Sequence, residues 1–167
     1  MPLIFIALAL LAAPLPGDPA WHRIAGDEWS VYYVEASTIR TEGDIKTAMT
    51  MSANSEPSDS GAYNIIVAVE YDCAAGTFRD VLYNYLDNAG NILKKEEPRF
   101  GPEFRTPRAG GYNDLMMRFV CHGVGGTRVD EPLGDADAWF AQHGCRHGTA
   151  ELRGKTGQFI HLYRKPK

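Results

Sequence analysis

The sequence has few of the features that mark membrane-spanning, nucleic-acid-binding or metal-dependent proteins. Its apolar run at residues 3–13 is about half of the roughly 20 residues that a helix needs to cross a bilayer. Lysine and arginine number 17 against 21 aspartates and glutamates, so the net charge of −4 provides no general basic field for nucleic acid. The chain also lacks a phosphate-binding loop and the standard zinc-ligand spacings. We therefore expect no cofactor and no nucleic-acid partner.

The apolar run is followed by the breaker-rich stretch PLPGDPA, which is the order found in a secretory signal peptide. No Lys or Arg precedes the run and no clean A-x-A cleavage site is visible, so a strand or helix of a cytosolic core is the alternative. The first cysteine is Cys73, so no cysteine is placed to carry a lipid anchor. We predict a signal peptide over residues 1–17 and an exported protein, in the periplasm or on the outer cell surface. No integral membrane segment is expected after signal removal.

Five segments have the composition and period-two alternation of β-strands: residues 29–35, 45–53, 63–72, 77–86 and 91–96. The segment 45–53 alternates apolar with mostly polar residues, so we expect one of its faces to lie in solvent. In the segment 63–72 the alternation continues to Cys73, which should share the apolar face. The stretch EASTIRTEGD is expected to turn the chain after the first strand. Short connections predict an antiparallel meander, to which residues 159–165 could add a sixth strand.

After a linker rich in Pro and Arg, the pattern changes to that of a helix. Tyr112, Leu115, Met116 and Phe119 lie at i, i+3, i+4 and i+7, which places them on one helical face, and Gly123 can end the helix. We expect this helix to cover the apolar face of the sheet. The predicted fold class is α+β, an antiparallel β-sheet meander of five to six strands with one amphipathic helix.

The remainder of the chain, residues 124–167, is predicted to be a C-terminal extension with a short helix. The stretch GVGGTRVDEP has the composition of a linker. In GDADAWFAQHG, Asp135 is expected to be the N-cap of the short helix and Gly144 its stop. The main domain would then span residues 18–123.

Three cysteines permit one disulfide and leave one thiol over, and an oxidising compartment favours the bridge. Cys121 stands at the end of the predicted helix and so reaches the sheet face to which Cys73 points. A Cys73–Cys121 bridge would close a long loop and contribute roughly 4 kcal/mol in the chain-entropy model. Cys121 lies off the stripe that ends at Phe119, so we expect the helix to fray or turn at its last residue. Cys145 would be left free or form an intermolecular bridge.

The order of several short motifs resembles a known family. WSVYYVEASTIR followed by GD, then VEYDC with FR soon after, then a Pro/Gly linker and a helix ending in Cys resemble the surface-adhesin protein E family of Gram-negative bacteria. The resemblance covers about residues 21–122. It implies an antiparallel sheet with a C-terminal helix tied to it by a disulfide. It also implies an exported protein whose named members bind host matrix proteins.

The candidate ligand-binding residues are the cations between the fifth strand and the helix: Lys94, Lys95, Arg105 and Arg108. Because the loop that carries them is held at both ends by rigid elements, we expect them to form one patch that binds a protein or a polyanionic ligand. The alternative is a solvated loop whose neighbouring acids cancel its field. We expect these cations to raise the rate of association, mostly at low salt.

A second class of function would use the C-terminal histidines and cysteine. His122, His143, Cys145 and His147 are candidate ligands for zinc or copper, which makes a periplasmic metal-binding protein the alternative. Their spacing is not a standard one, so no metal is expected. A Cys145 thiol near these histidines could act as a nucleophile, but no orienting acid is identifiable, and we predict that the protein is not an enzyme.

Tyrosines on the predicted strands offer another contact surface. If one helix covers only one face of the sheet, some of Tyr32, Tyr83 and Tyr85 are exposed and could form a protein contact, including a homodimer. The alternative is a second core layer beneath the C-terminal extension.

Overall fold

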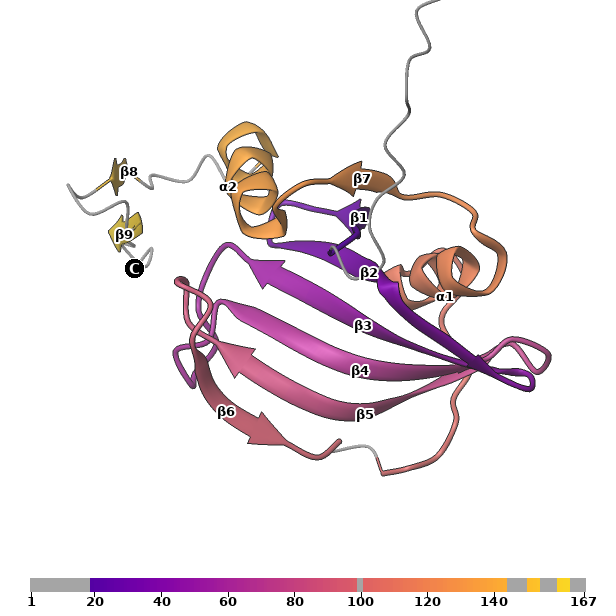
Figure 1. The fold of residues 1–167 in the computed structure, drawn as a ribbon. Helices are drawn as coiled ribbons and strands as arrows, with labels where there is room; N and C mark the ends of the chain where they lie inside the picture. The colour runs from indigo at the N-terminus through magenta and orange to yellow at the C-terminus, as the bar shows by residue number, and fades with distance from the viewer. Residues whose placement is uncertain (1–18, 99–100, 144–149, 154–158, 163–167) are drawn as a thin grey trace, which may run out of the picture.

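A computed structural model describes residues 19–98, 101–143, 150–153 and 159–162. Its main feature is a seven-stranded sheet in the order β6-β5-β4-β3-β2-β1-β7, with every neighbouring pair antiparallel (Figure 1). The strands are β1 (Trp21–Gly26), β2 (Ser30–Glu42), β3 (Ile45–Asn54), β4 (Asn64–Asp72), β5 (Thr77–Leu86), β6 (Ile92–Glu96) and β7 (Thr127–Val129). The helices are α1 (Tyr112–His122) and α2 (Pro132–His143). Two further strands, β8 (Ala150–Arg153) and β9 (Phe159–Leu162), pair with each other.

The five strands predicted from alternation correspond to β2 through β6, and the α+β meander is confirmed. The turn expected within EASTIRTEGD is present but shorter than predicted, because β2 continues to Glu42 and the chain reverses at Gly43 and Asp44. Gly43 has a φ of 63°, a conformation that glycine adopts without steric cost. The segment expected to be a linker contributes β7, which pairs with β1 at the edge of the sheet.

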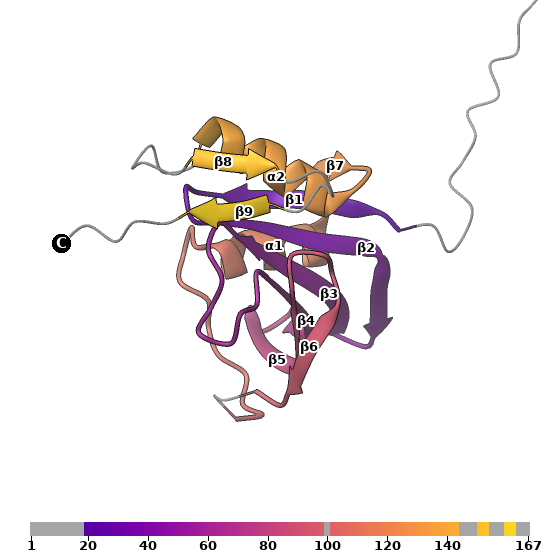
Figure 2. The same cartoon turned by 90° about the vertical axis from the view of Figure 1, so that its left-hand side faces the viewer.

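The two helices cover opposite faces of the sheet near β1 and β2 (Figure 2). Met116 and Val120 of α1 join a core cluster that includes Val34, Ala48 and Tyr71. On the other face, Ala136 of α2 packs with four buried sheet residues, which are Val31, Tyr33, Met51 and Ala53. The prediction of a solvent-facing side for residues 45–53 was therefore wrong, since β3 is a central strand with cover on both faces.

Helix α1 is rotated relative to the predicted stripe. Tyr112 is 45% exposed, whereas Met116 and Val120 are buried. Cys121 lies within the helix and faces the sheet from there, so the predicted fraying does not occur. Gly123 ends the helix as predicted, in a left-handed conformation with its N–H donating to the carbonyl oxygen of Phe119 at 2.8 Å.

The predicted disulfide is present. Cys73 and Cys121 are joined across 48 residues of sequence, so the bridge ties the C-terminal end of α1 to the end of β4. Beside it, Lys46 Nζ donates to the carbonyl oxygens of Val120 and Cys121, each at 3.1 Å. A cation at this end of a helix also opposes the negative end of the helix dipole. Two independent contacts therefore fix the same helix terminus.

Helix α2 forms as predicted, but it starts earlier. The Glu131 carboxylate accepts hydrogen bonds from the backbone N–H groups of Leu133 and Gly134, so Glu131 caps the helix. Pro132 occupies the first helical position, where its missing N–H is not needed. The prediction that Asp135 is the N-cap was wrong, because its side chain faces the sheet. The predicted stop, Gly144, lies outside the described residues.

The contacts of α2 with the sheet are specific. Asp135 accepts hydrogen bonds from Tyr33 Oη at 2.8 Å and from Arg23 Nη1 at 2.7 Å. Trp139 Nε1 donates to the Asp27 carbonyl oxygen at 2.9 Å. Gly26 lies directly under this indole, and a Cβ at that position would be 2.8 Å from Trp139 Cε2. Packing and hydrogen bonds therefore attach residues beyond 123 to the sheet. The division into a main domain over residues 18–123 and a C-terminal extension remains a prediction.

Candidate binding surface

Strand β6 is an edge of the sheet that neither helix covers (Figure 1). Among the described residues it pairs with β5 alone, and four of its five residues are exposed. Ile92 is 55% exposed and Leu93 is 49% exposed, and on β5 Val81 and Leu82, just beyond the Glu96 end of the β5–β6 pairing, are exposed as well. An edge strand presents backbone N–H and C=O groups that another chain can pair with. This part of the molecule thus combines an open edge with exposed aliphatic side chains.

Two of the four candidate cations lie on this edge. Lys94 stands opposite Tyr85 and Lys95 opposite Asn84 in the β5–β6 register. Lys94 forms an ion pair with Glu96 of the same strand, whereas the Lys95 side chain is exposed. An exposed pair of this kind contributes little stability, so both ammonium groups can respond to an incoming charge.

Arg105 lies at the opposite end of β5. Its backbone forms a bridge with Phe78 through hydrogen bonds of 3.0 and 2.9 Å, and its guanidinium lies 4.7 Å from the centre of the Phe78 ring. The guanidinium also pairs with the buried carboxylate of Asp80. These contacts fix the linker against the sheet. Position 78 is seven residues from Tyr85, or roughly 23 Å along a strand, so Arg105 is well separated from Lys94.

Arg108 is exposed and precedes α1, where its carbonyl oxygen accepts a hydrogen bond from Gly111 N at 3.0 Å. The structure therefore divides the four cations between two places on the chain. Lys94 and Lys95 lie on the β6 edge, and Arg105 and Arg108 lie in the linker that leads into α1. Binding of a ligand by these residues remains a prediction.

The three tyrosines expected on the surface are all half-buried. Tyr32 stacks on Tyr112 with ring centres 4.2 Å apart and an interplanar angle of 2°. Tyr83 Oη donates to Asp80 Oδ2 at 2.7 Å, and burial together with this hydrogen bond raises the pKa of the tyrosine. Tyr83 and Tyr85 have ring centres 6.1 Å apart. The contact between Tyr32 and Tyr112 could not be predicted from the sequence, in which the two residues are far apart.

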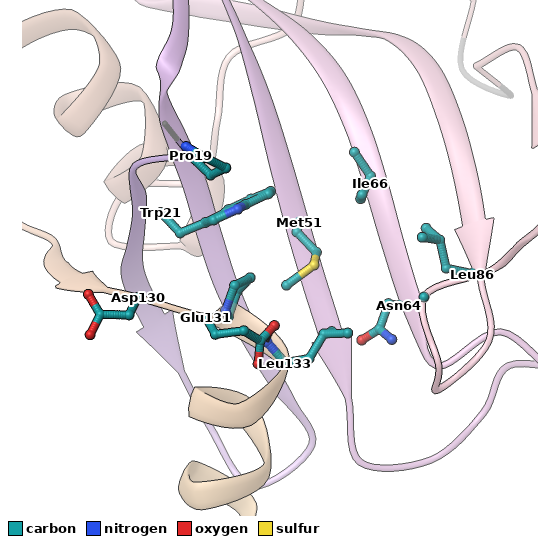
Figure 3. Close-up of a pocket in the computed structure, with 11 residues that line it drawn as sticks. Pro19, Trp21, Met51, Asn64, Ile66, Leu86, Asp130, Glu131 and Leu133 are labelled. Atoms are coloured by element: carbon teal, nitrogen blue, oxygen red, sulfur yellow. Dashed lines mark hydrogen bonds between the residues drawn. The ribbon is translucent and has the colours of Figure 1, made fainter. Parts of the chain in front are cut away.

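A cavity of about 300 Å³ lies on the face of the sheet that α2 covers, beside the start of that helix (Figure 3). Its walls are mainly apolar, with Trp21, Met51, Ile66, Leu86 and Leu133 among them. Asn64 also lines the cavity and uses its side-chain N–H to bind the Asp87 carbonyl oxygen at 3.0 Å. Such a cavity can accept an apolar group, but its walls do not place a nucleophile beside a base.

Of the four candidate metal ligands, the structure describes His122 and His143, and these two lie on different helices. His122 ends α1, and His143 ends α2 with its ring stacked on Trp139 at 4.2 Å. Cys145 and His147 lie outside the described residues. Within the described ranges, no three His, Cys, Asp or Glu side chains are grouped as metal ligands would be. None of the helices in those ranges is long and apolar enough to span a membrane.

The fold and its edge therefore define an α+β domain with a disulfide-tethered helix and an open strand. The family model for surface-adhesin protein E matches residues 21–122, more than half of the chain, and the chain belongs to that family. It is accordingly an adhesin-like surface protein. The matched range runs from β1 to the end of α1 and leaves out β7 and α2. Comparisons with curated proteins and with solved structures gave no match.

Proposed function

We propose that the protein is an exported, non-enzymatic binding domain that attaches to host or matrix proteins through its β6 edge. The observation that supports this most directly is the exposure of Ile92 and Leu93 next to Lys94 and Lys95 on an uncovered edge strand. Family membership supports the adhesive role.

The mode of binding follows from the chemistry of the edge. An extended segment of the partner adds to the sheet by main-chain hydrogen bonds, and its side chains select the sequence. Aliphatic partner residues cover Ile92 and Leu93, and acidic partner residues face the two lysines. A partner strand that alternates apolar and acidic residues therefore fits this edge. A homodimer formed through the same strand would appear as a doubled mass in solution.

The test compares binding of residues 18–167 to a panel of immobilised extracellular-matrix proteins at about 50 mM and 500 mM salt. Charge contacts are screened over about 8 Å at physiological salt and over shorter distances above it. We expect the double variant Lys94→Ser, Lys95→Ser to bind about tenfold more weakly at low salt and nearly normally at high salt. Its melting temperature should be unchanged, since neither lysine is buried.

Arg108→Ser is the matched control, because it removes an exposed cation that lies away from β6. It should have a smaller effect than the lysine pair. An equal loss in Arg108→Ser would place the contact in the linker, and full binding by the lysine variant would reject the β6 edge. Arg105→Ser is kept separate, because loss of its pair with Asp80 affects stability.

A further inference from the structure

A second cavity, of about 240 Å³, lies on the α1 side of the sheet. Strands β2 to β5, the linker and α1 all line it: β2 gives Tyr32, β5 gives Asp80 and Tyr83, the linker gives Arg105, α1 gives Tyr112, and β3 and β4 form the floor between them. We call this site the tyrosine pocket. Its volume is somewhat below the range of about 300–1,000 Å³ that is usual for drug-sized ligands, so it suits one ring rather than a chain.

The polar side of the tyrosine pocket is the ion pair between Asp80 and Arg105, whose opposite charges cancel. The Asp80 carboxylate is buried and accepts hydrogen bonds from Tyr83 Oη and from Arg105. A carboxylate has about four acceptor sites, and a guanidinium carries five donors in a fixed plane. Adjacent ligand hydroxyl groups could therefore donate to the acid and accept from the base. Because the two charges already cancel, a charged ligand would have to disturb a partly buried ion pair, which is costly.

The apolar side is aromatic. Tyr32 and Tyr112 are stacked in parallel, and Tyr112 is 45% exposed. Val67 and Ile65 extend this wall along β4. The face of a tyrosine ring carries negative charge and attracts the weakly positive C–H groups of a saturated ring. The pocket thus offers C–H contacts on one side and paired hydrogen-bonding groups on the other.

We propose that the tyrosine pocket binds one neutral sugar ring, such as the terminal hexose of a glycan. A hexose has hydroxyl groups around its rim and a C–H face, and it carries no charge, which matches the two sides of the pocket. No residue of β6 lines the pocket, although Tyr83 stands opposite Glu96 of that strand, and the proposal does not depend on binding at the β6 edge. It would give the protein a carbohydrate contact in addition to its protein contact.

The test is an NMR titration of ¹⁵N-labelled residues 18–167 with free glucose, galactose, mannose, fucose, N-acetylglucosamine and N-acetylgalactosamine. N-acetylneuraminic acid is the charged comparison. For a ligand of about 12 heavy atoms, ordinary ligand efficiency gives a Kd of a few millimolar. We expect at least one neutral sugar to bind in this range and to shift the amide signals of Tyr32, Asp80 and Tyr112.

Two variants test the placement. Tyr112→Ala removes the exposed part of the aromatic wall and should weaken binding at least fivefold. Trp29→Ala is the matched control, because Trp29 is 47% exposed and lies outside the tyrosine pocket, and it should bind normally. The proposal is wrong if no neutral sugar binds at 20 mM, if the charged sugar binds more tightly, or if the shifts lie elsewhere. Unchanged affinity in Tyr112→Ala would also reject it.

Discussion

The Tyr33 hydroxyl, on a fully buried residue of β2, donates a hydrogen bond to Asp135 Oδ2 of α2 at 2.8 Å. The Asp135 carboxylate also forms an ion pair with Arg23 of β1, so this one side chain joins α2 to two strands of the sheet. The raised pKa of Tyr33, caused first by burial and then by Asp135, agrees with a hydroxyl that stays protonated as the donor. Helix α2 lies beyond the range of the family match, yet it is bonded to the centre of the fold.

Removing α2 should therefore destabilise the protein. A chain that ends at Gly123 loses the packing of Ala136, Trp139 and Phe140 against the sheet. Full burial of one large apolar side chain contributes about 1.5–3 kcal/mol, and Trp139 and Phe140 are partly buried, so the loss should be about 2–4 kcal/mol. Thermal melting followed by circular dichroism measures it. A chain that ends at His143 is the control and should melt close to the full chain, whereas equal melting of all three chains would support an independent domain over residues 18–123.

Removing the hydroxyl group should lower the free energy of unfolding at one core tyrosine, Tyr33, but not at another, Tyr71. Tyr33→Phe leaves the Asp135 carboxylate without one donor and should cost about 1.5–3 kcal/mol of unfolding free energy. The Tyr71 hydroxyl is buried and has no hydrogen-bond partner among the described residues. Tyr71→Phe should therefore be neutral or stabilising. Urea denaturation of the two variants makes the comparison, and a larger loss in Tyr71→Phe would show that its hydroxyl is satisfied in solution.

The disulfide should account for a large part of the stability. Replacing Cys73 and Cys121 together with Ala opens a bridge across 48 residues and should lower the unfolding free energy by about 2–4 kcal/mol. Cys145→Ala should not change the melting temperature, since it removes the thiol left over by this pairing. Peptide mapping without reductant checks the pairing itself. A native Cys73–Cys145 or Cys121–Cys145 bridge would be inconsistent with the structure.

Acid should weaken the N-terminal end of α1. The Asp114 carboxylate accepts a hydrogen bond from Gly110 N at 2.9 Å and pairs with Arg118 at 2.9 Å, and both contacts lower its pKa. A lowered pKa in the folded state gives stability that is present above about pH 3.9, the unfolded value, and is lost as the pH falls through the folded value. Asp114→Asn should therefore show a flatter decline of stability between pH 5 and 2. Parallel pH curves for the two proteins would rule out this role of Asp114.

Local patterns predicted most of the sheet, but they failed where the structure depends on distant partners. Strands β2 to β5 have long alternating segments, whereas β7 has three residues and depends on distant partners, pairing with β1 and packing Val129 against the core cluster beneath α2. The apolar spacing from Tyr112 to Phe119 identified helix α1 but not its rotation, which the bridge at Cys121 and the contacts of Lys46 help to fix.

The candidate sites differ in the same way, since one is formed by residues adjacent in the sequence and the other by residues far apart in it. Lys94 and Lys95 could be named as candidates from the sequence, because a basic pair at the end of a short predicted strand is visible locally, and their role in binding remains a prediction. The tyrosine pocket was not, because Tyr32, Arg105 and Tyr112 meet only after the sheet and α1 have assembled. The aromatic residues were visible one by one, and only the register of the strands brings them together.

The β6 edge is tested most directly by amide hydrogen exchange with the matrix protein that binds best. If a partner strand adds to β6, the β6 amides that point away from β5 become hydrogen-bonded, and their exchange should slow at least tenfold. Strand β7, at the opposite edge of the sheet, is the internal control and should exchange at the same rate with and without partner. Unchanged exchange in Ile92–Glu96 with new protection in Thr127–Val129 would contradict the proposed binding surface.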